Sequence, residues 1–125
     1  MATKNLGRTD FAEVVKRDGI AFVDFWAAWC GPCRAFAPIY GRAAEQHHDI
    51  VFAKVDTEAE QQLASEFRIT SIPTLMVFRD GILVFSQPGS LPAPQLEQLI
   101  QGARALDMDD VRRQVAEQRA AAEAP

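Results

Sequence analysis

The sequence predicts an α/β fold in which a central mixed β-sheet is flanked by helices, with an extra helical extension at the C-terminal end. Three observations support this prediction. Apolar runs of strand length alternate with segments of helical periodicity. The turn dipeptide Asp80-Gly81 separates two β-rich runs. The only two cysteines, Cys30 and Cys33, stand where an apolar run gives way to a helix-like segment.

The first predicted helix begins at Asp10, because Glu13 occupies the position from which a side chain can reach back to the helix cap. Gly19 is expected to follow its end. Residues 20–26 are almost continuously apolar and aromatic. Such a run predicts a strand that is buried on both faces, as in a sheet covered by helices on both sides.

The second predicted helix runs from Cys30 to about His47. Phe36 and Tyr40 lie at helical spacing within it. Pro38 falls inside this pattern, and because proline lacks the backbone N–H of a helix interior, we expect a kink there.

The second half of the chain continues the alternation. Residues 50–55 predict a strand, and residues 57–60 resemble a capping box that opens a short helix. Residues 74–78 and 82–86 predict an antiparallel hairpin around Asp80-Gly81. The short helix is expected to bury Ala59, Leu63 and Phe67.

The last core helix is predicted from about Pro94, a residue suited to the first helical turn. One of its sides presents Leu96, Leu99, Ile100 and Ala103. We therefore expect one domain over residues 1–106. Residues 107–125 predict a helical extension that packs weakly, because Val111 and Val115 contribute only a thin apolar stripe.

Composition limits the possible partners. With 125 residues, of which 48% are hydrophobic and 24% charged, the chain fits one ordinary globular domain. A net charge of −4 provides no basic surface, so we expect no nucleic-acid partner. No apolar span reaches membrane length and the first residues lack the pattern of an export signal. We expect a cytoplasmic monomer that does not associate with membranes.

The Cys30-Gly31-Pro32-Cys33 motif carries the clearest chemistry. If Pro32 lies in the first helical turn, Cys30 sits at the helix N-terminus, where unpaired N–H groups and the helix dipole favour a thiolate. Cys33 lies one turn further along the same face. Cys30 is thus predicted to attack a disulfide, and Cys33 to resolve the resulting mixed disulfide, without a cofactor.

Two other interpretations of the cysteine pair are weaker. A zinc site would need two further ligands, and the only histidines are the adjacent His47 and His48. A purely structural disulfide would close so short a loop that it would remove little entropy from the unfolded chain. Redox chemistry is the favoured interpretation.

Asp24 is the other notable residue, because a carboxylate inside an apolar strand is costly to ionise. Phe22 and Trp26 share its face by the two-residue strand period. Burial should raise its pKa and make it a proton carrier near neutral pH. The alternative is that the strand alternation turns Asp24 toward solvent.

The chain resembles the thioredoxin family from Phe11 to about Ala105. The residues that carry the resemblance are the strand and motif at 21–33, Ile72-Pro73-Thr74, Gly81 and Gly89. The sequences at 33–39, 57–60 and 71–74 are most similar to the bacterial thioredoxin 2 branch. That branch normally carries an N-terminal zinc ribbon built from further cysteines, which this chain does not have, so no property of the ribbon is transferred.

The resemblance implies a thioredoxin fold and roles for several residues. Asp24 would correspond to the family's buried aspartate, which helps to deprotonate Cys33, and Lys54 to its lysine neighbour. Pro73 would form the family's cis-proline loop, and Ile72 would pair with an extended substrate segment. The implied substrate-binding residues are Trp29, Gly31, Pro32, Ile72, Pro73 and Gly89.

The function implied is reduction of disulfides in cytosolic proteins, with an NADPH-dependent thioredoxin reductase recycling the Cys30–Cys33 disulfide. A different class of function is an interaction or chaperone-like module of the same fold, in which binding matters more than turnover. A protein oxidant or isomerase is a third class, but it would be expected to have a signal peptide and another dipeptide between the cysteines.

Overall fold

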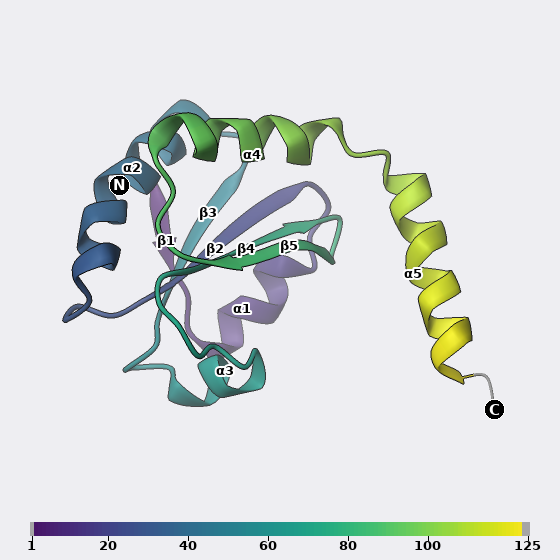
Figure 1. Cartoon of the computed structure of the whole chain (residues 1–125), viewed down its shortest axis with the longest axis horizontal. Coiled ribbons are helices and arrows are strands. Elements are labelled where there is room, and N and C mark those ends of the chain that lie inside the picture. The colour runs from purple at the N-terminus through teal and green to yellow at the C-terminus, as the bar shows by residue number, and fades with distance from the viewer. Residues whose placement is uncertain (1, 124–125) are drawn as a thin grey trace.

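A computed structural model describes residues 2–123 and contains a five-stranded sheet with helices on both faces (Figure 1). In chain order the elements are β1 (Thr3–Asn5), α1 (Arg8–Val15), β2 (Ile20–Trp26), α2 (Gly31–Gln46), β3 (Val51–Asp56), α3 (Gln61–Glu66), β4 (Thr74–Arg79), β5 (Ile82–Pro88), α4 (Ala93–Ala105) and α5 (Met108–Glu123).

The strand order is β1-β3-β2-β4-β5. The first three strands in this order pair in parallel, whereas β4 runs antiparallel to both β2 and β5, so the sheet is mixed as predicted. This order makes β2 the central strand. Because the Cys30–Cys33 motif follows β2 after residues 27–29, the two cysteines are held at one end of the central strand.

Residues of β2 alternate between two hydrophobic cores. Val23 and Phe25 pack with α1 and α3 on one face of the sheet. Phe22 packs on the other face in a cluster that contains residues of α2 and α4. Both faces of β2 are therefore covered, which explains why its sequence is almost continuously apolar.

The predicted helix 30–47 is confirmed as α2, and the helix continues through Pro38. The last core helix is also confirmed: α4 has a proline in its first turn and buries Leu96, Ile100 and Ala103. Arg79, at the end of β4, directs its Nη1 to carbonyl oxygens at the C-terminal end of α4 at 2.8–3.1 Å, those of Ala103, Arg104 and Leu106.

Two predicted helix starts are wrong. Helix α1 begins at Arg8 after Gly7, without a side-chain cap. Helix α3 begins at Gln61, and the hydroxyl of Thr57 donates to the Trp26 carbonyl at 3.0 Å rather than capping the helix. The predicted burial is correspondingly only partly right, because Leu63 is buried, Phe67 is half-buried and Ala59 is exposed.

Strand β1 was not predicted from the sequence. Its three residues are mostly exposed and carry no alternating pattern, and they are ordered by pairing with β3. A short edge strand of this kind is formed by its partner rather than by its own side chains.

The predicted hairpin is confirmed, with Asp80 and Gly81 at φ values of 52° and 82°. Both positive values match a type I′ turn, the connection whose twist suits two antiparallel strands. A Cβ on Gly81 would lie 3.3 Å from the Lys16 carbonyl oxygen, so this position requires glycine for space as well as for conformation.

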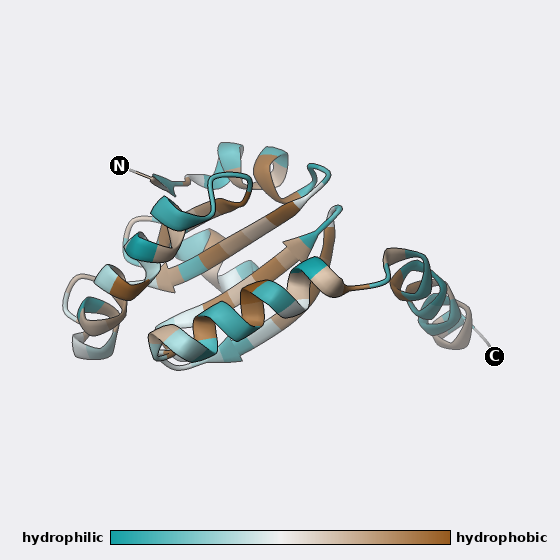
Figure 2. Ribbon diagram, turned by 90° about the horizontal axis from the view of Figure 1, so that it is seen from above, coloured by the Kyte–Doolittle hydropathy of each residue, from teal (hydrophilic) through white to brown (hydrophobic). Residues whose placement is uncertain are grey.

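Helix α5 projects away from the sheet and its helices (Figure 2). Met108 is its only buried residue among those described, and Val111 and Val115 are half-buried. The expected weak packing is thus confirmed for residues up to Glu123, while Ala124 and Pro125 lie outside the described part of the chain. No helix within residues 2–123 has the length and apolar character needed to cross a membrane.

Candidate active site

Cys30 and Cys33 form a disulfide at the start of α2. Cys30 is the N-cap residue, and its Sγ accepts a hydrogen bond from the Cys33 backbone N–H at 3.2 Å. Pro32 occupies the first turn, where a missing N–H costs nothing. In the reduced protein the same N–H and the positive end of the helix dipole would stabilise a Cys30 thiolate.

The two cysteines do not differ in exposure. Cys30 is 4% exposed and Cys33 3%, and both pack with Ala27, Trp26 and Ile72. In the disulfide form, exposure therefore does not distinguish the attacking cysteine from the resolving one. What distinguishes Cys30 is its hydrogen bonding, because its Sγ receives the N–H of the first helical turn.

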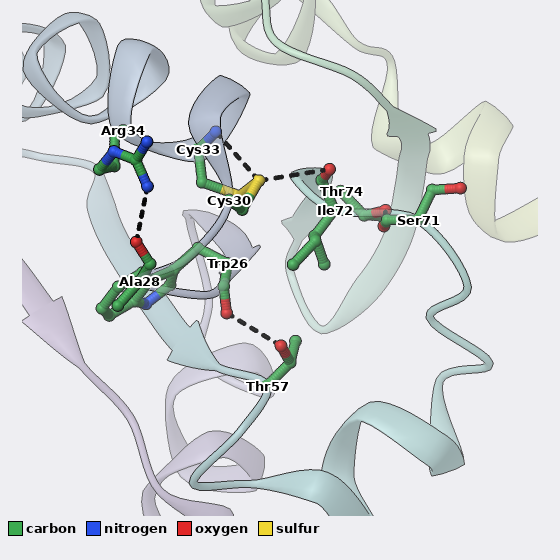
Figure 3. The surroundings of a disulfide bond; sticks show 9 residues. All are labelled: Trp26, Ala28, Cys30, Cys33, Arg34, Thr57, Ser71, Ile72 and Thr74. Atoms are coloured by element: carbon green, nitrogen blue, oxygen red, sulfur yellow. Dashed lines mark hydrogen bonds between the residues drawn. A yellow bond between two sulfur atoms is a disulfide. The ribbon is translucent and has the colours of Figure 1, made fainter.

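The loop opposite the disulfide contains the cis peptide bond between Ile72 and Pro73. The carbonyl oxygen of Ile72 lies 3.6 Å from the Sγ of Cys30 (Figure 3). The carbonyl oxygen of Pro73 accepts the Gly89 N–H at 2.8 Å, and Gly89 has a φ of 108°. The structure thus brings these three predicted residues together at one edge of the disulfide.

An apolar surface surrounds this edge. Trp29 is 67% exposed, an unusual exposure for so large an apolar side chain. Gly31 and Pro32 are also exposed. These three belong to the set that the resemblance implied for substrate binding, and all three are exposed. Of the others in that set, Gly89 is exposed, Ile72 is half-buried and Pro73 is buried.

Asp24 is fully buried in the centre of β2, so the alternative of a solvent-facing carboxyl is wrong. Neither of its carboxyl oxygens has a hydrogen-bond partner within the described residues. Burial raises the pKa of Asp24 from 3.8 to about 7, and the positive charge of Lys54 opposes the rise. Asp24 therefore titrates near neutral pH, where a carboxylate can accept a proton from a cysteine thiol.

Lys54 is half-buried on β3 and is the register partner of Asp24. Its Nζ lies 4.7 Å from the centroid of the Trp26 ring, a cation–π arrangement. A pocket beside the strands is lined by Trp26, Lys54, Asp56 and Glu60, among other residues. Lys54 therefore lines this pocket and is also close enough to Asp24 for its charge to lower the pKa of that carboxyl.

The sequence did not single out Tyr40 or Arg34. Tyr40 is fully buried and its hydroxyl donates to the Ala53 carbonyl at 2.7 Å. Burial, and secondarily the Asp24 charge, raise the pKa of Tyr40 well above its usual value. Its helical spacing indicated only a core position. Arg34 extends back toward the motif, where its guanidinium donates to the Ala28 carbonyl at 2.9 Å (Figure 3).

The residues weighed for zinc are not brought together. His47 is paired with Glu97 and Arg104, remote in sequence from the cysteines. Within residues 2–123 no cluster of three or more histidine, cysteine, aspartate or glutamate side chains has the arrangement of a metal site.

Comparisons with known proteins agree on one family. Residues 2–102 match the family model described as Thioredoxin. The chain is 51% identical over 121 residues to the putative thioredoxin 2 of Streptomyces coelicolor, covering 97% of this chain and 90% of that protein. It is 42% identical to the thioredoxin of Alicyclobacillus acidocaldarius, covering 77% and 92% of the two chains. The solved structure of Plasmodium falciparum thioredoxin superimposes with a TM-score of 0.74 at 32% identity, covering 80% and 98%.

Proposed function

This chain belongs to the thioredoxin family, and from that premise we propose a role for each residue of its active site. The chain is a protein dithiol–disulfide oxidoreductase that acts through Cys30 and Cys33. A module that only binds is not favoured, because the chain carries the redox-active cysteine pair of the family. The observation that carries the proposal is the Cys33 N–H donated to the Cys30 Sγ at 3.2 Å.

Cys30 is the attacking residue in this proposal. Its thiolate attacks one sulfur of a substrate disulfide, forms a bond to that sulfur and releases the other as a thiolate. The Cys33 thiol then loses its proton and attacks the Cys30 Sγ. The second substrate thiolate leaves, the Cys30–Cys33 disulfide forms, and two electrons have passed to the substrate.

Asp24 accepts the Cys33 proton. A carboxyl with a pKa of about 7 is close to evenly divided between its two forms at neutral pH, so it can take up a proton and return it. Lys54 is a positioning residue in this step, because its charge favours the carboxylate form of Asp24. The released proton neutralises one of the departing thiolates.

The substrate lies against Trp29, Gly31, Pro32, Ile72, Pro73 and Gly89. An extended segment bearing the target cysteine pairs with the backbone of Ile72, whose carbonyl is already 3.6 Å from the reactive sulfur. Trp29 covers the segment from the motif side. Backbone pairing makes this recognition independent of most substrate side chains, which suits a reductant of many proteins.

The substrates are proteins that contain disulfides. We further propose that an NADPH-dependent thioredoxin reductase returns the pair to the dithiol, and that the protein acts in the cytoplasm, where such a reductant can be kept reduced. The protein would act as a monomer over a domain of residues 1–106, because every residue assigned above comes from one copy of that segment.

Reduction of insulin disulfides by dithiothreitol tests the proposal. The native protein should accelerate precipitation of the insulin B chain, and Cys30→Ser should be inactive. In a separate incubation of the reduced protein with insulin and without dithiothreitol, Cys33→Ser should accumulate as a mixed disulfide with its substrate, visible on a non-reducing gel and absent after reduction. A mixed disulfide that accumulates with Cys30→Ser and not with Cys33→Ser would reject the assigned order of attack.

A further inference from the structure

We infer that Arg34 makes this oxidoreductase prefer protein disulfides with an acidic residue near the attacked cysteine. The inference rests on the proposed function, because it concerns the substrate that Cys30 attacks. Three observations carry it: the position of the Arg34 guanidinium, its freedom from carboxylate partners within residues 2–123, and the geometry of the substrate edge.

The Arg34 guanidinium is held beside the motif. The backbone of Arg34 donates to the Cys30 carbonyl at 3.1 Å, in the first turn of α2. Its side chain turns back, and Nη1 donates to the Ala28 carbonyl at 2.9 Å. Nη2 lies 3.9 Å from the point that a Cβ on Gly31 would occupy. The guanidinium therefore lies beside Ala28 and Gly31, next to the Cys30–Cys33 motif.

Arg34 keeps most of its binding capacity. A guanidinium has five N–H donors, and here one hydrogen bond is made, to a neutral carbonyl. Among residues 2–123, no carboxylate forms an ion pair with Arg34, and its side chain is exposed. A carboxylate of a bound substrate can thus approach it directly, in the forked geometry that guanidinium groups favour.

Few charged side chains lie in the segments beside the disulfide. Three segments border the disulfide: residues 27–34, residues 70–74 around the cis-proline, and residues 87–92 around Gly89. In the sequence of these segments Arg34 is the only ionisable side chain apart from the two cysteines. Within these three segments the one ionic charge is therefore positive, although the whole protein carries a net charge of −4.

The geometry also indicates which part of the substrate meets Arg34. In Figure 3, Arg34 and Ile72 lie on opposite sides of the Cys30–Cys33 pair. A substrate segment would pair with Ile72 through the residues on one side of its cysteine. The residues on the other side of that cysteine would then lie toward Arg34. An Asp or Glu within a few residues of the attacked cysteine would then reach the Arg34 guanidinium.

Three peptides test the inference. They share one sequence and carry a cysteine activated by a neutral 2-thiopyridyl group, and they differ only in the neighbouring residue, which is Glu, Gln or Lys. The rate of thione release by the reduced protein measures attack by Cys30. An exposed ion pair of this kind changes a rate by about two- to fivefold, so the Glu peptide should exceed the Lys peptide by about that factor. Arg34→Gln should abolish the preference and Arg34→Glu should reverse it.

Arg42→Gln is the matched control, because Arg42 is an exposed arginine further along α2 and its loss changes the net charge equally. It should leave the preference unchanged. An unchanged Glu-to-Lys ratio in Arg34→Gln would overturn the inference. An equal loss of rate with all three peptides would also overturn it, since Arg34 would then act on the Cys30 thiolate. Failure of the native protein to attack the Gln peptide would instead reject the proposed function.

Discussion

Asp24 and Lys54 are register partners across the parallel pairing of β2 and β3. One is a fully buried carboxyl with no hydrogen-bond partner within residues 2–123, and the other is the cation whose charge lowers its pKa. Burial is nonetheless the larger effect, so the pKa of Asp24 remains high, at about 7. The pair therefore sets the pH range in which the site can accept a proton.

Replacing Lys54 by Met should raise the pKa of Asp24 above its value of about 7, because the opposing charge is removed while the burial remains. At pH 7 a smaller fraction of Asp24 would be carboxylate, so turnover should fall, and it should recover toward pH 8–9. The pH profile of insulin reduction and a carboxyl NMR titration measure the shift. Lys4→Met, on the exposed edge strand β1, is the control and should leave both curves in place.

Replacing Asp24 by Asn should stabilise the oxidised protein above pH 7. The native state holds the Asp24 proton up to about pH 7, whereas the unfolded chain releases it near 3.8. Wild-type stability should therefore fall as the pH rises through this window, by about 4 kcal/mol at the upper end. An asparagine has no proton to lose, so its advantage should be near zero below pH 4 and largest above pH 7.

Urea unfolding of both proteins between pH 4 and 8 measures this difference in the free energy of unfolding. The contributions of other titrating groups cancel in the difference, because both proteins contain them. Turnover of Asp24→Asn should fall in the same range, since the proton acceptor is gone. A gap in stability that stays constant with pH, or turnover equal to that of the wild type, would contradict a buried titrating role for Asp24.

Alkylation should separate the two thiols. In the reduced protein at neutral pH, iodoacetamide should modify Cys30 faster than Cys33, because the Cys30 Sγ receives the Cys33 N–H and the helix dipole. The two residues are almost equally buried in the disulfide form, so their hydrogen bonding is what distinguishes them there. Peptide mapping of single-modified protein gives the ratio, and equal labelling of the two positions would remove the basis for assigning Cys30 as the attacking residue.

Much of this fold could be predicted from the sequence where side chains alone determine the structure. Strand β2 has the predicted bounds because its apolar run is buried on both faces, and the hairpin follows from the conformations that Asp80 and Gly81 adopt. The ends of α1 and α3 were less predictable. There the capping pattern competes with tertiary contacts, and the hydroxyl of Thr57 bonds to Trp26 instead of capping a helix.

The residues of the candidate site also divide into those that the sequence predicts and those that only the fold reveals. Cys30, Cys33 and Asp24 could be found from their residue types and their placement after or within an apolar strand. Arg34 could not, because an arginine on a helix is normally a solvated charge, and only the fold brings its guanidinium back to Ala28. Tyr40 likewise matched an ordinary core stripe, although its hydroxyl bonds across to β3.

Arg79 should contribute measurably to stability. Its guanidinium lies within hydrogen-bonding distance of the carbonyls of Ala103, Arg104 and Leu106, which the end of α4 leaves without helical partners. Arg79→Met should lower the free energy of unfolding by about 1.5–3 kcal/mol, as expected for hydrogen bonds from a charged donor. The urea midpoint measures this loss, and Arg42→Met should show almost none. A loss no larger than that of the control would mean that these carbonyls do not depend on Arg79.

Removal of residues 107–125 should leave the redox domain active. A chain ending at Leu106 keeps all three carbonyls that Arg79 contacts and loses mainly the buried Met108 side chain and the exposed Arg112–Asp80 ion pair. The free energy of unfolding should fall by about 2–3 kcal/mol, most of it from Met108. Insulin reduction should continue at the full rate, and size-exclusion chromatography should show monomers before and after truncation. Loss of activity, or conversion of a dimer to a monomer, would instead make α5 part of the active or assembled protein and reject a domain that ends at residue 106.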